Sequence, residues 1–452
     1  MSTTNLFSDF NTVSAKEWKQ KIQMDLKGAD YNETLLSNSL EGITIQPFYH
    51  QENFNSLAIP EQKNNVKICQ TIFINDEKIV NNITTEVLQK GAESIRFIAN
   101  KPFRIKQVFD KLPKEIDYIL ICNFYEEKFI TKLISFSKEI NLHIVIDSIH
   151  HFVSDGNWFQ NKQADFDNLI TISNDITIGI NASLYQNAGA NIIQQIAYSL
   201  AHVNEYLNLL NNEDQRPIAK DYIFTFAIGS NYFFEISKIR AFKYLIKKLL
   251  TEYNSDSKVK IILEPTLRNK TLYDYNVNLL RTTTESMSAI LSGADFVTNV
   301  SYDSIYHRSN EFGSRIARNQ LLVLKEESYF NKETDLSKGS YYIEQITFEI
   351  ADKALALFKD IEKNGGFLTQ LEKGTIQRKI EESAKKEQIL FDNGELILLG
   401  TNKYPNENDK MKDELELYPF VKTRPRKTQI KPIIPRRLSE KLEQERLKKE
   451  RS

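Results

Sequence analysis

The sequence predicts an α/β protein: a closed (β/α)8 barrel, preceded by an arm of helix and extended chain and followed by a short basic tail. Three observations favour this fold. Short apolar runs rich in β-forming residues alternate with segments of helical periodicity, which is typical of parallel sheets. Seven or eight such units follow one another mostly ~25 to 40 residues apart, as in a barrel. The phosphate-binding patterns GxGxxG and GxxxxGK[ST] do not occur, although an open doubly wound sheet usually has a glycine-rich first turn.

The chain is expected to open with an arm over residues 1–80. WKQKIQMDLKGADYNETLL (18–36) is helical in pattern, and EGITIQPFY (41–49) is extended. We expect this arm to pack on the outside of the barrel or on a partner.

The barrel is expected over residues 81–405. Apolar residues recur at spacings of three and four in 126–140 and in 233–253, which predicts helices there. The expected strands are SIRFIA (94–99), YILICNF (118–124), LHIVIDSI (142–149), ITIGIN (176–181), YIFTFAIG (222–229), VKIILEP (259–265) and DFVTNVS (295–301).

The remaining residues, 406–452, are expected to form a linker and a basic helix. The proline-dotted stretch KTRPRKTQIKPIIPRR (422–437) should be extended, with the last helix apart from the barrel. From Val421 to Ser452 there are 12 Lys/Arg and 4 Asp/Glu, a charge of +8 that leaves −9 on the rest of the chain. Such a tail could bind nucleic acid, but no aromatic residue lies between its charges to stack on bases. A solvated helix, capped by Ser439, is the favoured interpretation.

Composition indicates a folded, cytoplasmic protein. Of the 452 residues, 41% are hydrophobic and 26% are charged, which excludes disorder throughout. The amino terminus has no basic start followed by an apolar core, and no run approaches the ~20 apolar residues that cross a bilayer. The two cysteines, Cys69 and Cys122, lie in apolar runs, as reduced structural thiols of a cytosolic protein do.

Common catalytic signals are scarce. None of the six histidines forms HExxH or another metal-ligand spacing, and no GxSxG nucleophile motif is present. His150 and His151, with Asp147 and Asp155, could hold a metal. Adjacent histidines on a strand point to opposite faces, however, so we favour a strand-end loop over a metal site.

Several longer strings, taken together and in order, resemble the methylmalonyl-CoA mutase family of cobalamin-dependent acyl-CoA isomerases. The resemblance covers most of residues 15–405 and implies a barrel through which, in catalytic members, the acyl-CoA tail threads. The strings are WKQKIQMDLKGADYNETLL (18–36), EGITIQPFY (41–49), NASLYQNAGANIIQQIAYSLAHVNEYL (181–207), FAIGSNYFFEISKIRAF (226–242), NVNLLRTTTESMSAILSGAD (276–295), SRIARNQLLVLKEES (314–328) and KGSYYIEQITFEIADKALALFKDIEKNGG (338–366).

The sequence departs from the catalytic pattern at the loop NASLYQNAGA (181–190). Catalytic members have a Tyr-His pair there, whose histidine donates a hydrogen bond to the substrate thioester. Alignment on Ala188, Gly189 and Ala190 puts Ser183 at the tyrosine and Leu184 at the histidine. Leucine can neither donate nor accept a hydrogen bond. The resemblance therefore implies no catalytic residue in this chain.

Further departures agree. No histidine has an acid two residues before it, so the family's DxHxxG cobalt-binding motif is missing. We expect the residues after the barrel to be too few for a complete flavodoxin-like cobalamin domain. Residues 141–176 have nothing like the substrate-binding arginine segment, and the approach loop is shortened to LEPTLRNKTLYDY (263–275). What is retained lies mostly in segments that would build the barrel: Asn231, Arg240, Arg281, Arg315, Arg318 and Tyr341.

This combination resembles the small, non-catalytic subunit of heterodimeric members of the family. The resemblance implies a large catalytic partner that holds adenosylcobalamin and the acyl-CoA substrate and interconverts (R)-methylmalonyl-CoA and succinyl-CoA. No cofactor or metal is expected on this chain, and neither nucleic acid nor a membrane is expected as a partner. Two alternatives stay open: a catalytic chain whose cobalamin sits on a separate protein, and a regulatory or nucleic-acid-binding barrel that uses the basic tail.

Overall fold

A closed barrel of eight parallel strands forms the centre of the protein. The computed structural model describes residues 8–60, 66–210, 221–332, 335–422 and 425–451. Around the barrel the strands follow the order β10-β3-β4-β5-β6-β7-β8-β9, so each lies beside its neighbour in sequence and β10 closes on β3. Their bounds are Lys67–Phe73 (β3), Ser94–Ala99 (β4), Asp117–Cys122 (β5), Leu142–Ile146 (β6), Thr177–Asn181 (β7), Asp221–Ile228 (β8), Lys258–Pro265 (β9) and Phe296–Val297 (β10).

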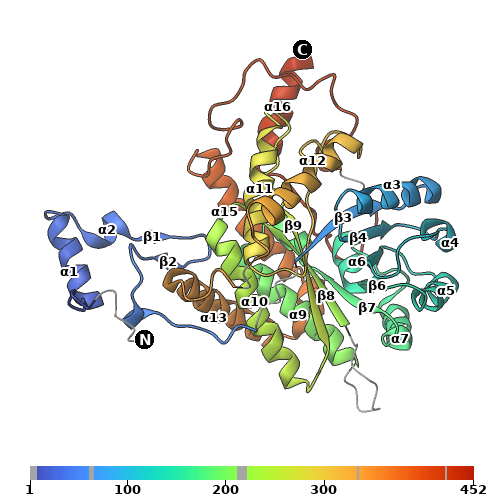
Figure 1. Ribbon diagram of the computed structural model, residues 1–452, viewed down its shortest axis with the longest axis horizontal. Helices are drawn as coiled ribbons and strands as arrows, with labels where there is room; N and C mark the ends of the chain where they lie inside the picture. Colours follow the sequence, from blue (N-terminus) through green and yellow to red (C-terminus); the bar gives the residue numbers. More distant parts are fainter. Residues whose placement is uncertain (1–7, 61–65, 211–220, 333–334, 423–424, 452) are drawn as a thin grey trace.

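Helices cover the outside of the barrel (Figure 1). Their bounds are Glu77–Gln89 (α3), Ile105–Val108 (α4), Glu127–Ser137 (α5), Ser148–Asp155 (α6), Lys162–Ile172 (α7), Ser183–Asn187 (α8), Ile192–Leu210 (α9), Tyr232–Glu252 (α10), Val277–Leu291 (α11), Glu311–Leu322 (α12), Tyr341–Lys363 (α13), Gly366–Glu372 (α14) and Thr375–Asp392 (α15). A π-helical turn, η2 (Val323–Glu327), extends α12. Most of α9 is buried because the barrel covers one side of it and α13 and α14 cover the other. No helix in the described ranges is long and apolar enough to cross a bilayer.

The predicted (β/α)8 fold is confirmed, and all seven predicted strands are present. The eighth strand, β3, lies inside the residues predicted to form the arm, so the barrel begins at Lys67 rather than near residue 81. Polar Lys67, Gln70 and Thr71 interrupt its apolar run, which hides the strand from a hydrophobicity pattern. His150 and His151 also differ from expectation, because they lie on helix α6 rather than on a strand-end loop.

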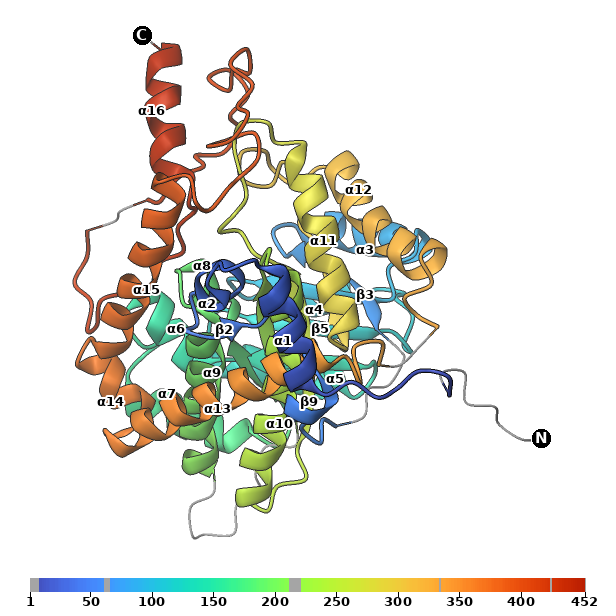
Figure 2. The same cartoon turned by 90° about the vertical axis from the view of Figure 1, so that its left-hand side faces the viewer.

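The arm projects from the barrel as a separate lobe (blue in Figures 1 and 2). It contains α1 (Ala15–Asp25), α2 (Tyr31–Leu35), a hairpin of β1 (Ser37–Asn38) and β2 (Thr44–Ile45), and the short 3-10 helix η1 (Gln51–Asn53). A capping box between Ser14 and Glu17 starts α1. Residues 1–7 and 61–65 of the predicted arm lie outside the described residues.

The arm is tied to the barrel at the start of α13. The ring of Tyr49 contacts that of Tyr342 with centroids 5.2 Å apart, and the ring of Phe54 contacts that of Tyr341 at 4.6 Å. Beyond these contacts the lobe leaves apolar side chains in solvent: Phe10, Val13, Trp18 and Met24 are 44% to 74% exposed. A surface of this kind is typical of a partner-binding element.

The carboxyl-terminal segment is packed on the barrel rather than separate from it. Ile430, Ile433 and Leu438 are buried, and the backbone N–H of Ile433 donates to the carbonyl of Val153 over 2.9 Å. Helix α16 (Glu440–Arg451) rests on the chain around Leu272 through the buried Glu443, whose carboxylate accepts from the Leu272 N–H at 2.7 Å. The prediction of a free linker and a detached helix is therefore wrong for the described part of the tail; residues 423, 424 and 452 lie outside it. The leucines and isoleucines scattered along this segment attach it to the barrel.

Candidate functional site

The loop 181–190 lies at the carboxyl end of β7, where its short helix α8 is buried throughout. Gly189 has φ +102°, and a Cβ on it would approach the Cβ of Ala384 on α15 to 2.4 Å, so only glycine fits there. The Ala-Gly-Ala sequence therefore lets α15 close over the loop and turns the chain into α9. This is the structural reason for the loop composition.

Ser183 and Leu184 occupy enclosed positions within that loop. Leu184 is 7% exposed and belongs to the main apolar core. The Ser183 hydroxyl donates to the Glu264 carboxylate at 2.6 Å and accepts from the side-chain amide of Asn187 at 3.1 Å. Asn187 in turn accepts from the Thr266 hydroxyl and the Leu267 N–H, at 2.9 and 2.8 Å. The side chains of Ser183 and Asn187 thus join the loop to the carboxyl end of β9.

A buried polar relay holds the other side of the loop. The Tyr185 hydroxyl lies 3.0 Å from Nδ1 of His202 on α9, and Nε2 of His202 lies 3.0 Å from the Asp147 carboxylate. Asp147 also accepts from the Tyr206 hydroxyl at 2.8 Å and from the His150 backbone N–H at 2.8 Å, which caps α6. The relay therefore connects α6, α8 and α9 through one carboxylate.

The protonation of this relay follows from its contacts. Burial acts to raise the pKa of Asp147, but His202 and the other donors outweigh it and hold the pKa below its ordinary value. Burial lowers the pKa of His150 and raises that of Tyr185. The groups that donate to Asp147 therefore keep its buried carboxylate ionised at neutral pH.

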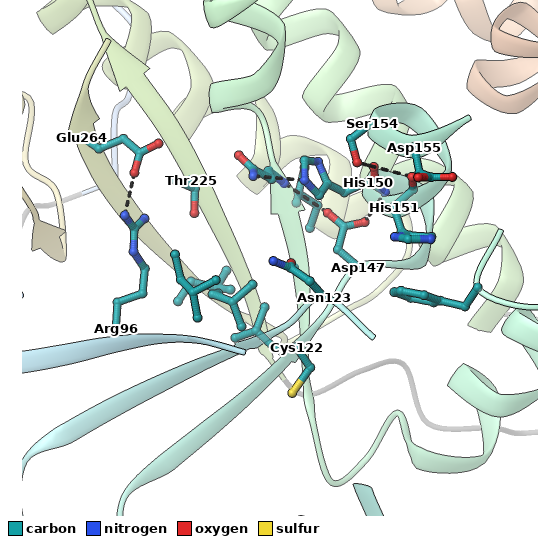
Figure 3. A pocket seen from close by; sticks show the side chains of 18 residues that line it. Arg96, Cys122, Asn123, Asp147, His150, His151, Ser154, Asp155, Thr225 and Glu264 are labelled. Atoms are coloured by element: carbon teal, nitrogen blue, oxygen red, sulfur yellow. Dashed lines mark hydrogen bonds and ion pairs between the residues drawn. The ribbon is translucent and has the colours of Figure 1, made fainter. Parts of the chain in front are cut away.

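A cavity of about 410 Å³ opens beside the relay (Figure 3). It lies at the carboxyl ends of β4–β9, the face at which (β/α)8 enzymes place their active sites. Its polar wall includes Arg96, Asp147, His150, Asp155 and Glu264. Its apolar floor is formed by Ile98, Ile121, Val145 and Ile223.

Below this cavity the barrel interior is filled. A layer of inward-facing side chains packs into one cluster in which none of the buried members is more than 3% exposed: Cys69, Ile119, Val145, Ile223, Ile262 and Phe296. Above the layer Arg96 donates to Glu264 at 2.7 Å and to the Thr71 hydroxyl at 3.0 Å. Below it Asp117 contacts Lys67, Lys260 and His143. Side chains rather than a channel therefore occupy the axis of the barrel.

The sequence contains a signal for two of these inner residues. Arg96 stands in the middle of the apolar run SIRFIA, and Glu264 stands near the end of VKIILEP. An isolated charge in a strand of a buried parallel sheet indicates an inward-facing pair, because such a charge needs a partner. Their partnership across 168 positions requires the barrel register, which the runs alone do not supply.

The retained residues mostly build structure. Arg240 pairs with Asp335 at 2.7 Å and with Glu344 at 2.8 Å, which joins α10 to the start of α13. Arg281 donates to the Leu399 carbonyl at 2.7 Å, and Arg318 donates to the Lys90 carbonyl at 3.0 Å. Two more contact neighbouring rings, Arg315 with Phe312 and Tyr341 with Phe54, and Asn231 precedes α10.

The histidine rings make contacts within the protein. Five of the six ring systems contact a hydrogen-bonding group of the protein: His50, His143, His150, His202 and His307. The sixth, His151, lies flat on the ring of Phe159 with centroids 4.0 Å apart. Within the described residues no group of three His, Cys, Asp or Glu side chains could hold a metal ion.

Comparisons of this chain with family models and with known proteins agree on one family. Residues 169–449 match the family described as methylmalonyl-CoA mutase. The chain is similar to the methylmalonyl-CoA mutase small subunit of Porphyromonas gingivalis, with 32% identity over 450 residues that cover 91% of this chain and 73% of that protein. It is also similar to the large subunit from the same organism, with 31% identity over 262 residues, 56% of this chain and 36% of that protein.

A third relative, the methylmalonyl-CoA mutase of Rhizobium meliloti, is 34% identical over 251 residues, which cover 53% of this chain and 35% of that protein. The matches to the large subunit and to this mutase thus span about a third of those proteins. The match to the small subunit extends over nearly the whole of this chain.

Proposed function

This chain belongs to the methylmalonyl-CoA mutase family, and we propose that within it the chain is the small, non-catalytic subunit of a two-subunit mutase. In this proposal a large partner subunit binds the acyl-CoA and adenosylcobalamin and interconverts (R)-methylmalonyl-CoA and succinyl-CoA in the cytoplasm. The small subunit supports the partner through the arm, residues 1–80, and the barrel. Porphyromonas gingivalis has proteins named as both subunits, which is consistent with such a pair.

The filled barrel is the observation that carries this proposal. A catalytic barrel of the family has to admit the acyl-CoA tail along its axis, whereas here Ile119, Ile262 and Phe296 pack across the axis and Arg96 pairs with Glu264 above them. Opening a channel would expose this apolar layer and separate a buried ion pair, and both changes are unfavourable.

The position of Leu184 supports the same proposal. A catalytic donor there would have to reach a substrate, but Leu184 is packed in the core, and Ser183 beside it is committed to Glu264. Removal of a single donor from a polarising site costs roughly 2.7 to 4 kcal/mol of transition-state stabilisation. We therefore assign no catalytic residue to this chain.

Adenosylcobalamin is assigned to the partner in this proposal, because no histidine of this chain stands in the family's DxHxxG cobalt-binding motif. When bound, the cofactor supplies the radical that starts the rearrangement. The contribution of this chain is to hold the partner in a competent shape.

The contacts of the basic tail weigh against a nucleic-acid-binding function. Arg426 pairs with Asp155 at 2.7 Å, Arg437 pairs with Glu443 at 2.5 Å, and Arg446 donates to the Asp409 carbonyl at 2.5 Å. Charges already paired within the protein release few counterions from a nucleic acid.

Reconstitution tests the proposal. The chain and its large homologue are purified alone and after co-expression, and mutase turnover is measured with excess adenosylcobalamin. We expect a stable heterodimer with activity and no turnover from this chain alone, even with a separate cobalamin-binding protein present. Turnover by the isolated chain would instead establish the split catalytic alternative.

A Leu184→His variant provides the matched test of the loop. In the heterodimer it should leave turnover within about twofold of the parent, provided that gel filtration shows intact assembly. Loss of turnover from an assembled heterodimer would show that the loop acts in catalysis and would contradict the proposal.

A further inference from the structure

The cavity at the carboxyl face of the barrel is a formed pocket that the proposed subunit function leaves without a role. Its volume of about 410 Å³ lies within the range of small-molecule sites. It lies above the filled layer of the barrel, so a ligand could enter it from the surface without opening the axis. Figure 3 shows the Arg96–Glu264 pair on one side and Asp147, His150, His151 and Asp155 on the other.

The ionised groups that line the cavity are mostly acidic. Arg96 supplies one positive charge, whereas Asp147, Asp155 and Glu264 supply three negative charges, an excess of two. Arg426 pairs with Asp155 from outside and reduces the excess to one. Burial lowers the pKa of both His150 and His151, so the two imidazoles add no positive charge at neutral pH. An anion such as a carboxylate or phosphate is therefore disfavoured in this field.

The walls also offer acceptors. The side-chain amide nitrogen of Asn123 donates to Asn100, which leaves the Asn123 carbonyl oxygen as an acceptor. The Asn181 amide oxygen is buried and has no hydrogen-bond partner within the described residues. The stacked rings of His151 and Phe159 add an aromatic face, which attracts cations. A group with several N–H donors and a positive charge complements these walls.

The floor of the cavity selects for an apolar portion. Ile98, Ile121 and Ile223 present their side chains there, so an ion without a hydrocarbon part would leave this surface in water. We propose that the cavity is a binding site for a small organic ammonium ion whose apolar stem rests on the isoleucine floor. This site is independent of the subunit assignment, because it follows from the cavity walls alone.

Three isosteric probes test the charge preference: cyclohexylmethylammonium, cyclohexylmethanol and cyclohexanecarboxylate. Each is titrated into the full chain with ¹³C-labelled isoleucine δ1 methyl groups, and the methyl signals of Ile98, Ile121 and Ile223 are followed by NMR. We expect the ammonium probe to shift these signals with an affinity at least tenfold above that of the alcohol, and the carboxylate to bind most weakly. The ammonium affinity should fall as salt is raised.

Two variants localise the site. Asp155→Asn should weaken ammonium binding several-fold and leave alcohol binding unchanged, whereas Asp167→Asn on the exposed face of α7 is the matched control and should change neither. Phe159→Leu removes the aromatic face and should also weaken the ammonium probe, which keeps the test decisive if Asp155→Asn fails to fold. Equal binding of the ammonium and the alcohol, tightest binding of the carboxylate, or shifts confined to isoleucines outside the floor would each overturn the proposal.

Discussion

Arg96 on β4 and Glu264 on β9 form an ion pair across the inside of the barrel, with Nη2 of Arg96 2.7 Å from Oε2 of Glu264. The two side chains are only 10% and 19% exposed. Glu264 also accepts from Ser183, so the pair connects the interior of the barrel to the loop that follows β7. A change in this pair would therefore affect both the packing of the barrel and the shape of the candidate site.

The first prediction concerns this pair. Arg96→Met should reduce the free energy of unfolding by about 3 kcal/mol, because it leaves the Glu264 charge buried without its partner. The double variant Arg96→Met/Glu264→Leu should lose less than the sum of the two single variants, since neither charge then remains. Urea unfolding measures all three, with Arg378→Met on an exposed i,i+4 pair as the control. Additive losses would show that the two side chains do not interact.

The strand pattern explains why most of the fold could be predicted. β4, β5, β7 and β8 are largely buried on both faces and read as mainly apolar runs, as strands of parallel sheets do. β3 could not be predicted this way because Lys67 and Thr71 belong to polar layers inside the barrel. The packing of the carboxyl-terminal segment on the barrel could not be predicted for a related reason. A few buried side chains, such as Ile433 and Leu438, attach a segment whose composition is that of a linker.

The candidate site was only partly predictable. The position of Leu184 and Ser183 at the end of β7 follows from the loop sequence, but the commitment of Ser183 to Glu264 requires contact between strands that are distant in the chain. The sequence relates Asp147 and His150 only through a metal site that it disfavours, and it does not predict their place in the relay. His202, which fixes Asp147 in place, could not be identified from the sequence because α9 contains other buried polar residues, such as Gln195, Ser199 and Asn204.

The second prediction concerns the filled barrel. Phe296→Ala should cost about 3 to 5 kcal/mol of stability, because the inner layer cannot collapse into the space that the ring leaves. Chemical denaturation measures this loss. Phe312→Ala removes a ring that is 53% exposed and should cost far less. Similar small losses in both variants would indicate a loosely packed interior and would weaken the argument against an axial channel.

The third prediction concerns attachment of the tail. The Glu443 carboxylate is fully buried, accepts from the Leu272 N–H and the Ser439 hydroxyl, and forms an ion pair with Arg437. Glu443→Ala should therefore release α16 and make the carboxyl-terminal segment sensitive to brief proteolysis, while the barrel remains resistant. Glu445→Ala alters an exposed side chain two residues further on and should leave the digestion pattern unchanged. Equal resistance of both variants would mean that other contacts are sufficient to hold the tail.

The last prediction concerns pH and Glu362, at the end of α13. Burial, with the nearby charge of Glu205, raises the pKa of Glu362 to about 7, although Asn204 donates a hydrogen bond to it at 2.8 Å. A carboxyl group with a raised pKa in the folded state keeps its proton when the unfolded chain has already lost it. Its contribution to stability is therefore complete below about pH 4.5, the ordinary value, and is lost as the pH rises through about 7.

Glu362→Gln removes the titration but keeps an oxygen that can accept from Asn204. The variant should match the parent at pH 4 and exceed it by about 1 to 2 kcal/mol at pH 8, a figure reduced for partial solvent exposure of the carboxyl group. Urea unfolding at several pH values measures the difference, with exposed Glu372→Gln as the control. A Glu362→Gln protein that follows the parent's pH profile throughout would show that this carboxylate is ionised at no cost in the folded state.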